Sequence, residues 1–155
     1  MSQIVVWRLS REVYAAESFS GEGSRRFGGR WSPAGLSVAY SSESRSLAAL
    51  EVLANVRDPA ILFARPWVVI AAAIPGELIE HPSRVPPNWR DTPYPSETQR
   101  FGAEWIQAAR SVALRVPSAV VLGEFNYLLN PAHPDFGRVK VGKPEPFSFD
   151  PRFKR

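Results

Sequence analysis

Apolar and polar positions along the chain form several short runs typical of strands and two longer stretches with helical spacing. The β-branched and aromatic run at residues 4–9 predicts a first strand, and residues 37–41 predict a second. The unbroken apolar run at residues 67–74 suits a strand buried on both faces. Shorter strand candidates follow at residues 112–116, 118–122, 139–141 and 147–149, with the polar-bracketed segment 126–131 among them.

The clearest helix is predicted at residues 43–56, with Ser42 placed to cap its N-terminus. From residue 47 to 56 only Glu51 and Asn55 carry polar side chains. At about 100° per residue, Glu51 falls on the same side as Leu50, among apolar neighbours. A carboxylate in that position must be paired or must line a cavity.

A second helix is predicted to begin near Ser96 and to continue at helical period to Val112. Ser96 and Gln99 have the spacing of a capping box. Two irregular segments separate the regular elements. Residues 18–33 are rich in glycine and arginine without a helical or strand period, and residues 81–95 hold five prolines, which predicts a surface loop.

The order of these elements indicates one α+β domain over residues 1–155. We find no internal repeat and no linker that divides the chain. Strands and helices fit a mixed α/β or α+β domain and lack the regular alternation of a doubly wound fold. We therefore predict mixed sheets with flanking helices.

Composition and charge exclude several function classes. The chain has no cysteine, which removes disulfides, thiolate nucleophiles and cysteine-based metal sites. Charged residues near the N-terminus interrupt any signal-peptide core, and no apolar run approaches the ~20 residues of a membrane span. We therefore expect a cytoplasmic protein without a membrane partner. The net charge of +4 suits a phosphate-bearing ligand or nucleic acid, although ordinary solubility charge is the simpler explanation.

The available side chains narrow the chemistry further. The chain has no phosphate-loop motif, no G-x-S-x-G motif and only two histidines, so we expect no metal site. Several polar residues are instead embedded in apolar or glycine-rich segments, namely Arg8, Arg30, Tyr40, Glu51 and Ser118. Each also has a purely structural explanation, such as a surface charge or a core aromatic ring.

Together these residue types suit a dinucleotide. Arginines offer planar forks to phosphates, and glycines let the backbone approach a pyrophosphate. An aromatic ring can stack on a flat base, and a carboxylate can stabilise an oxocarbenium-like centre or orient a ribose hydroxyl. This combination points to C–N bond cleavage at a ribose.

Five motifs resemble the RES domain, a family named for an arginine, a glutamate and a serine. GGRWSPAG at residues 28–35, VAYSSE at 38–43 and SLAALE at 46–51 fall in the family's order, and residues 115–121 and 126–136 resemble its C-terminal signature. The resemblance implies a fold similar to ADP-ribosyltransferases. It also implies a toxin of a bacterial toxin–antitoxin pair that consumes NAD by hydrolysis or phosphorolysis of the nicotinamide–ribose bond.

The resemblance implies roles for six residues. Arg30, Glu51 and Ser118 are the implied catalytic residues, with Glu51 as the catalytic carboxylate, and Arg8, Tyr40 and Asn126 are the implied substrate-binding residues. NAD is then a substrate, with inorganic phosphate as a candidate co-substrate, and no metal or cofactor is implied. The implied partner is an Xre-type helix-turn-helix antitoxin that blocks the active site. Ser32 stands where the family usually has asparagine, which weakens one expected loop hydrogen bond and leaves Arg30 and Glu51 unchanged.

Three other functions remain open from the sequence. A mono-ADP-ribosyltransferase that modifies a specific protein would use the same residues. Direct nucleic-acid binding is disfavoured because the basic residues form no stripe and no recognition motif is present, so we expect DNA contact only through an antitoxin complex. A non-catalytic interaction module is the third alternative.

Overall fold

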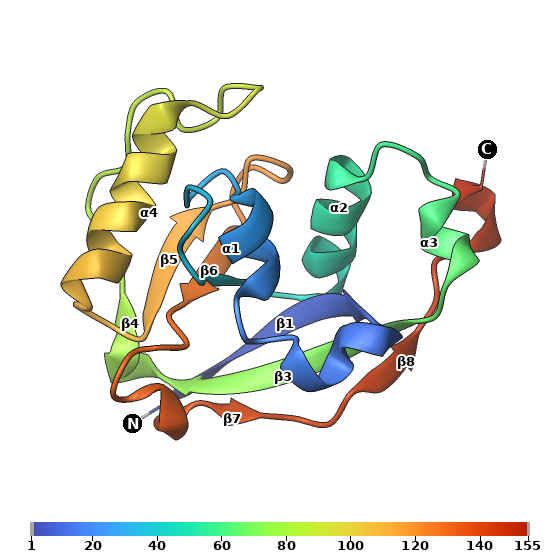
Figure 1. Ribbon diagram of the computed structural model, residues 1–155, viewed down its shortest axis with the longest axis horizontal. Coiled ribbons are helices and arrows are strands. Elements are labelled where there is room, and N and C mark those ends of the chain that lie inside the picture. Colours follow the sequence, from blue (N-terminus) through green and yellow to red (C-terminus); the bar gives the residue numbers. More distant parts are fainter. Residues whose placement is uncertain (1, 155) are drawn as a thin grey trace.

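The computed structural model describes residues 2–154, and all of its strands belong to one sheet with helices packed against it (Figure 1). The strands are β1 Gln3–Arg11, β2 Ala39–Ser42, β3 Trp67–Pro75, β4 Ile79–Glu80, β5 Ala113–Pro117, β6 Phe125–Leu129, β7 Lys140–Val141 and β8 Glu145–Phe147. The helices are α1 Glu22–Phe27, α2 Arg45–Asn55, α3 Ile61–Ala64 and α4 Ser96–Ala108. The strand order is β4-β5-β6-β2-β1-β3-β7, with β8 also paired to β3. Only β4 and β5 run parallel among these pairs, which confirms the predicted α+β class with a mixed sheet.

The sheet narrows at the junction of β1 and β2. Nine residues of β1 pair with β3, whereas β1 and β2 pair at a single position, Trp7 opposite Ser42. We call the strands β4, β5, β6 and β2 the β6 half, and β1, β3, β7 and β8 the β3 half. Figure 1 shows β5 and β6 running steeply across the direction of β1 and β3. The two halves therefore share few backbone hydrogen bonds.

Most of the strand predictions are confirmed, with shifted ends. β1 extends beyond residues 4–9, β2 lies slightly C-terminal to residues 37–41, and β3 and β5 match their apolar runs. The predicted strand at residues 118–122 is wrong. The Ser118 hydroxyl accepts hydrogen bonds from the backbone N–H groups of Val120 (3.1 Å) and Val121 (3.0 Å), so the chain turns directly after Pro117.

Both long helices are confirmed, and α4 begins at Ser96 as predicted, but the predicted caps and the C-terminal end of α4 are wrong. Ser42 does not cap α2, because its backbone is still paired with Asn126 in the sheet. The cap is Ser44, whose hydroxyl accepts from the Leu47 N–H at 3.0 Å. At α4 there is no capping box, because Pro95 occupies the N-cap and no side chain caps it. The helix stops at Ala108, since Ala109 turns left-handed with φ 51°.

The two irregular segments behave differently. Residues 81–95 contain neither helix nor strand, as their prolines predict. The predicted loop at residues 18–33 contains the short helix α1, which the sequence analysis missed. Its only large apolar side chain, Phe27, is 79% exposed, so no apolar face marks the helix in the sequence. Glu22 supports it instead by accepting hydrogen bonds from Arg25 and Arg26.

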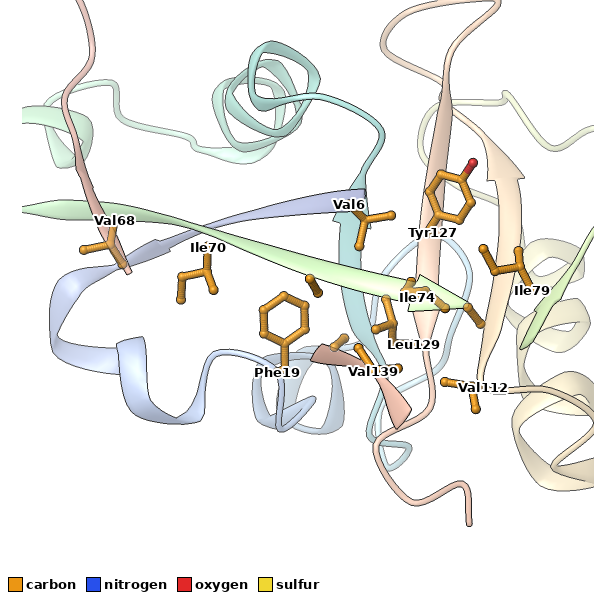
Figure 2. Close-up of a cluster of buried hydrophobic side chains, with 13 residues drawn as sticks. Val6, Phe19, Val68, Ile70, Ile74, Ile79, Val112, Tyr127, Leu129 and Val139 are labelled. Carbon is orange, nitrogen blue, oxygen red and sulfur yellow. The ribbon is translucent and has the colours of Figure 1, made fainter. Parts of the chain in front are cut away.

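Three apolar clusters hold the layers together. Figure 2 shows the first, in which Val6, Ile70 and Ile74 pack with Phe19 and Leu129. The second packs α4 and the loop before β2 onto the β6 half, through Trp31, Trp105, Leu114 and Leu128. The third packs α2 and α3 onto the β3 half, through Ala48, Leu62, Leu9, Val69 and Phe149. Helices α2 and α4 are thus fixed to different halves of the sheet.

Candidate functional site

The carboxylate of Glu51 lies at the centre of a hydrogen-bonded cluster of polar side chains. Glu51 is half-buried on α2, one turn after the buried Leu47. Its Oε2 accepts hydrogen bonds from the Ser118 hydroxyl at 2.7 Å and from Asn126 Nδ2 at 2.6 Å. Among residues 2–154 no hydrogen-bond partner is recorded for Oε1. The expectation that this carboxylate must be paired is confirmed, and one oxygen stays available to a ligand.

Ser118 directs its only hydroxyl proton toward Glu51. The residue follows β5 directly and is fully buried, with 0% of its surface exposed. Its oxygen already accepts from the N–H groups of Val120 and Val121, so its own proton is free to be donated to the carboxylate. The turn after Pro117, where the sequence predicted a strand, therefore orients the hydroxyl of this serine.

Asn126 is held from its other side by Ser42. Asn126 lies on β6, opposite Ser42 of β2 and Val116 of β5. The Ser42 hydroxyl donates to Asn126 Oδ1 at 2.7 Å, which turns the amide nitrogen toward Glu51. Ser42 is not among the site residues that the sequence predicts. Its position two residues after Tyr40 was the available signal, because alternate strand residues share a face.

Arg30 reaches across to the proline-rich loop. Its Nη1 donates to the backbone carbonyls of Trp89 (2.8 Å) and Asp91 (2.6 Å), and the guanidinium lies 5.9 Å from the centre of the Tyr94 ring. Burial lowers the pKa of Arg30, and the negative charge of Glu51 partly opposes this shift. Arg30 is thus within electrostatic range of Glu51 without a direct hydrogen bond to it.

The Tyr40 hydroxyl fixes the loop that carries Arg30. It accepts from the Trp31 N–H at 3.0 Å and shares a hydrogen bond of 2.8 Å with the Ser32 hydroxyl. Burial raises the pKa of Tyr40 to about 12. Ser32, the departure from the usual asparagine, is fully buried and also bonds the Ser24 hydroxyl at 2.9 Å. Because the Tyr40 hydroxyl is engaged by these loop residues, any contact of Tyr40 with a ligand would be made by its ring.

The Arg8 side chain leaves the sheet on the face opposite to that of Ser42. Trp7 shares a face with Ser42 by register, so the adjacent Arg8 side chain leaves β1 on the opposite side. Its Nη1 donates to the Tyr40 carbonyl at 2.9 Å and its Nε to the Ser18 hydroxyl at 3.1 Å. Burial lowers the pKa of Arg8 to about 10, so the side chain is cationic at neutral pH.

The structure therefore brings some of the six predicted site residues into contact and leaves others apart. Glu51, Ser118 and Asn126 are in direct contact, and Arg30 lies near them. Arg8 joins this group only through the backbone of Tyr40, and no contact between Arg8 and Glu51 is recorded within residues 2–154. Two surface hollows of about 300 and 350 Å³ lie elsewhere, around Trp67 and Phe147.

No group of three or more His, Asp or Glu residues in the described part of the chain is arranged to hold a metal ion. None of the helices in this part combines the length and apolar character needed to cross a membrane.

Comparison with known proteins places this arrangement in a family. The family model described as the RES domain matches residues 5–150. The chain is 35% identical to "Toxin Res" of Yersinia enterocolitica, over 97% of this chain and 100% of that protein. It is 34% identical to "Prs ADP-ribosylating toxin" of a Sphingobium species, over 96% of each chain.

The fold is also known from a solved complex. A chain in the crystal structure of the M. tuberculosis MbcT–MbcA toxin–antitoxin complex superposes with a TM-score of 0.72 at 20% identity, covering 95% of this chain and 85% of that one. At this identity the likeness shows the fold, while the sequence matches along nearly the whole chain show the ancestry. From these matches we conclude that the chain belongs to the RES domain family.

Proposed function

We propose that this RES-domain protein is a toxin that cleaves the nicotinamide–ribose bond of NAD. The observation that carries the proposal is the Glu51 carboxylate, held by Ser118 and Asn126 through one oxygen only. A carboxylate fixed in this way keeps its charge in a set position while its second oxygen can meet a ribose hydroxyl. The names of the two relatives as toxins support the biological role.

In this mechanism the protein lowers the barrier by stabilising positive charge on the ribose. The nicotinamide ring of NAD is already cationic and leaves as a neutral molecule, so the bond breaks without a proton donor. Positive charge then develops at the ribose carbon, and Glu51 stabilises it in the transition state. Water or phosphate attacks that carbon and completes the exchange.

The arginines are assigned to the phosphates of NAD. Arg30 uses Nη1 on the loop carbonyls, and the structure assigns no partner within residues 2–154 to its Nε and Nη2. Arg8 similarly has Nη2 left after its bonds to Ser18 and Tyr40. Guanidinium N–H groups suit phosphate oxygens in charge and geometry. The Tyr40 ring would then flank the nicotinamide side.

A second candidate is the transfer of ADP-ribose to a protein. It shares the same bond cleavage and differs only in the acceptor, which is a protein side chain in place of water or phosphate. The relative named as an ADP-ribosylating toxin favours this candidate.

We also propose that the protein acts in the cytoplasm and that an antitoxin of the Xre type covers its site. The solved toxin–antitoxin complex supports an antitoxin partner for this fold.

The test measures nicotinamide released from NAD by the purified chain, with and without inorganic phosphate. Glu51→Gln keeps the shape of the side chain and removes its charge, so we expect release to fall by at least about a hundredfold. Glu43→Gln is the matched control. Glu43 is exposed, lies just before α2 and accepts from the Phe125 N–H at 2.7 Å, so its variant changes the same charge outside the cluster.

The outcomes separate the alternatives. Release that requires Glu51 and increases with phosphate indicates phosphorolysis, and release independent of phosphate indicates hydrolysis. Label from NAD that appears on protein indicates the transferase. Wild-type release by Glu51→Gln would exclude Glu51 as the catalytic carboxylate.

A further inference from the structure

Ser42 makes one side-chain hydrogen bond within residues 2–154, to Asn126. It is 4% exposed, at the end of β2, and Asn126 is 9% exposed on the neighbouring strand. The two residues are direct register partners, and the Ser42 Oγ lies 2.7 Å from Asn126 Oδ1. The hydroxyl is therefore placed to act on Asn126 and, through it, on the carboxylate.

The direction of this hydrogen bond determines which end of the amide faces Glu51. An amide presents an acceptor oxygen at one end and a donor nitrogen at the other. With Ser42 donating to Oδ1, the nitrogen points at Glu51 Oε2, 2.6 Å away. Without that donor the oxygen is a buried acceptor with no recorded side-chain partner, and the amide loses the contact that fixes its rotation.

We propose that Ser42 is a positioning residue for the catalytic carboxylate, acting through Asn126. The proposal rests on the proposed function. Ser42, Asn126 and Glu51 form one line of hydrogen bonds from β2 through β6 to α2, and Ser118 meets the same oxygen from β5. Glu51 lies on α2, which packs on the β3 half of the sheet. This line of hydrogen bonds therefore fixes its carboxylate against residues of the β6 half.

Ser41 provides a matched control on the same strand. It is also 4% exposed, and its hydroxyl donates to the Tyr127 carbonyl at 2.9 Å. Its side chain leaves the opposite face of β2 and touches no member of the cluster in the described residues. Ser41→Ala and Ser42→Ala therefore each remove one buried hydrogen bond, and only the second removes a bond to Asn126.

The experiment compares the two alanine variants in nicotinamide release, after thermal unfolding has shown that both are folded. For Ser42→Ala we expect kcat to fall about tenfold with little change in KM, the size of one weakened hydrogen bond to a charged group. Ser41→Ala should keep the wild-type kcat. Ser42→Thr retains the hydroxyl and should restore most of the lost rate.

A double-mutant cycle tests whether Ser42 acts through Asn126. If it does, adding Ser42→Ala to Asn126→Ala causes little further loss, whereas independent roles give multiplicative losses. Equal rates for Ser42→Ala and wild type, equal losses in both alanine variants, or multiplicative losses would each overturn the proposal. A wild-type chain that releases no nicotinamide would instead refute the proposed function, and with it the positioning role of Ser42.

Discussion

Gly102 on α4 has no room for a side chain, and replacing it tests how the glycine loop is held. A Cβ built at this position would overlap the carbonyl oxygen of Trp31. Since that oxygen belongs to the backbone, no rotamer change can relieve the overlap, and α4 or the loop must move. Gln99 donates to the carbonyls of Gly29 and Ser32 from the same helix, so a displaced α4 also releases the loop that carries Arg30.

The expected cost follows from two opposing effects. Alanine in place of a helical glycine normally stabilises by roughly 0.5–1 kcal/mol, and forcing atoms into a packed interface costs roughly 1–3 kcal/mol. Gly23 on α1 is the matched control, because a Cβ there meets no atom within 4 Å. Gly23→Ala should therefore gain stability, while Gly102→Ala should lose about 1–2 kcal/mol.

The assay is urea unfolding of both variants, supported by thermal melts and by nicotinamide release. For a chain of 155 residues, a difference of about 2 kcal/mol separates the two melting temperatures by roughly 4–8 °C. We also expect Gly102→Ala to lose activity, since Arg30 moves with the loop. The reasoning is refuted if Gly102→Ala is at least as stable as Gly23→Ala and equally active.

Three further predictions concern single groups. Tyr40→Phe leaves the Trp31 N–H without its acceptor and should cost about 1–3 kcal/mol in denaturant unfolding. Because the pKa of Tyr40 is raised to about 12, wild-type stability should fall as pH rises from about 10 to 12, and Tyr40→Phe should flatten that fall in melts at alkaline pH. Hydrogen bonds from Arg25 and Arg26 lower the pKa of Glu22 to about 2, so its contribution is lost as pH falls from about 4.5 to 2, and Glu22→Gln should reduce the acid dependence of the melting temperature. Ala109→Gly should raise stability by about 0.5–1 kcal/mol, since glycine adopts φ 51° without strain; an unchanged or lower melting temperature would contradict this.

Local patterns were sufficient for most elements and for the central carboxylate. Strands β1 and β3 follow from β-branched runs, and Glu51 stood out because a charge among apolar helix positions needs a partner. The partners themselves depend on tertiary pairing. Ser118 meets Glu51 only because β5 ends beside α2, a contact across 67 positions of sequence that no local pattern encodes.

The two errors at the helix caps share one physical cause. Ser42 and Ser44 are both hydroxyls before the same helix, and the choice of cap depends on where β2 stops pairing with β6. Gln99 has the right spacing for a capping box, but the carbonyls of the glycine loop provide a better partner. In both cases a residue that local rules place at a helix cap makes its contacts with a distant segment of the chain.

The single-residue junction between β1 and β2 has a consequence for how the protein opens. Few backbone hydrogen bonds join the two halves of the sheet, so side chains make most of the link between them: the apolar cluster around Val6 and Leu129, and the hydrogen bonds of Glu51 and Arg8. Native-state hydrogen exchange should then resolve two cooperative units, with β3 amides and β6 amides exchanging at different free energies. Replacement of Glu51 should weaken the coupling between these units, so the same residue that is proposed to act on NAD also contributes to how cooperatively the two halves of the sheet unfold.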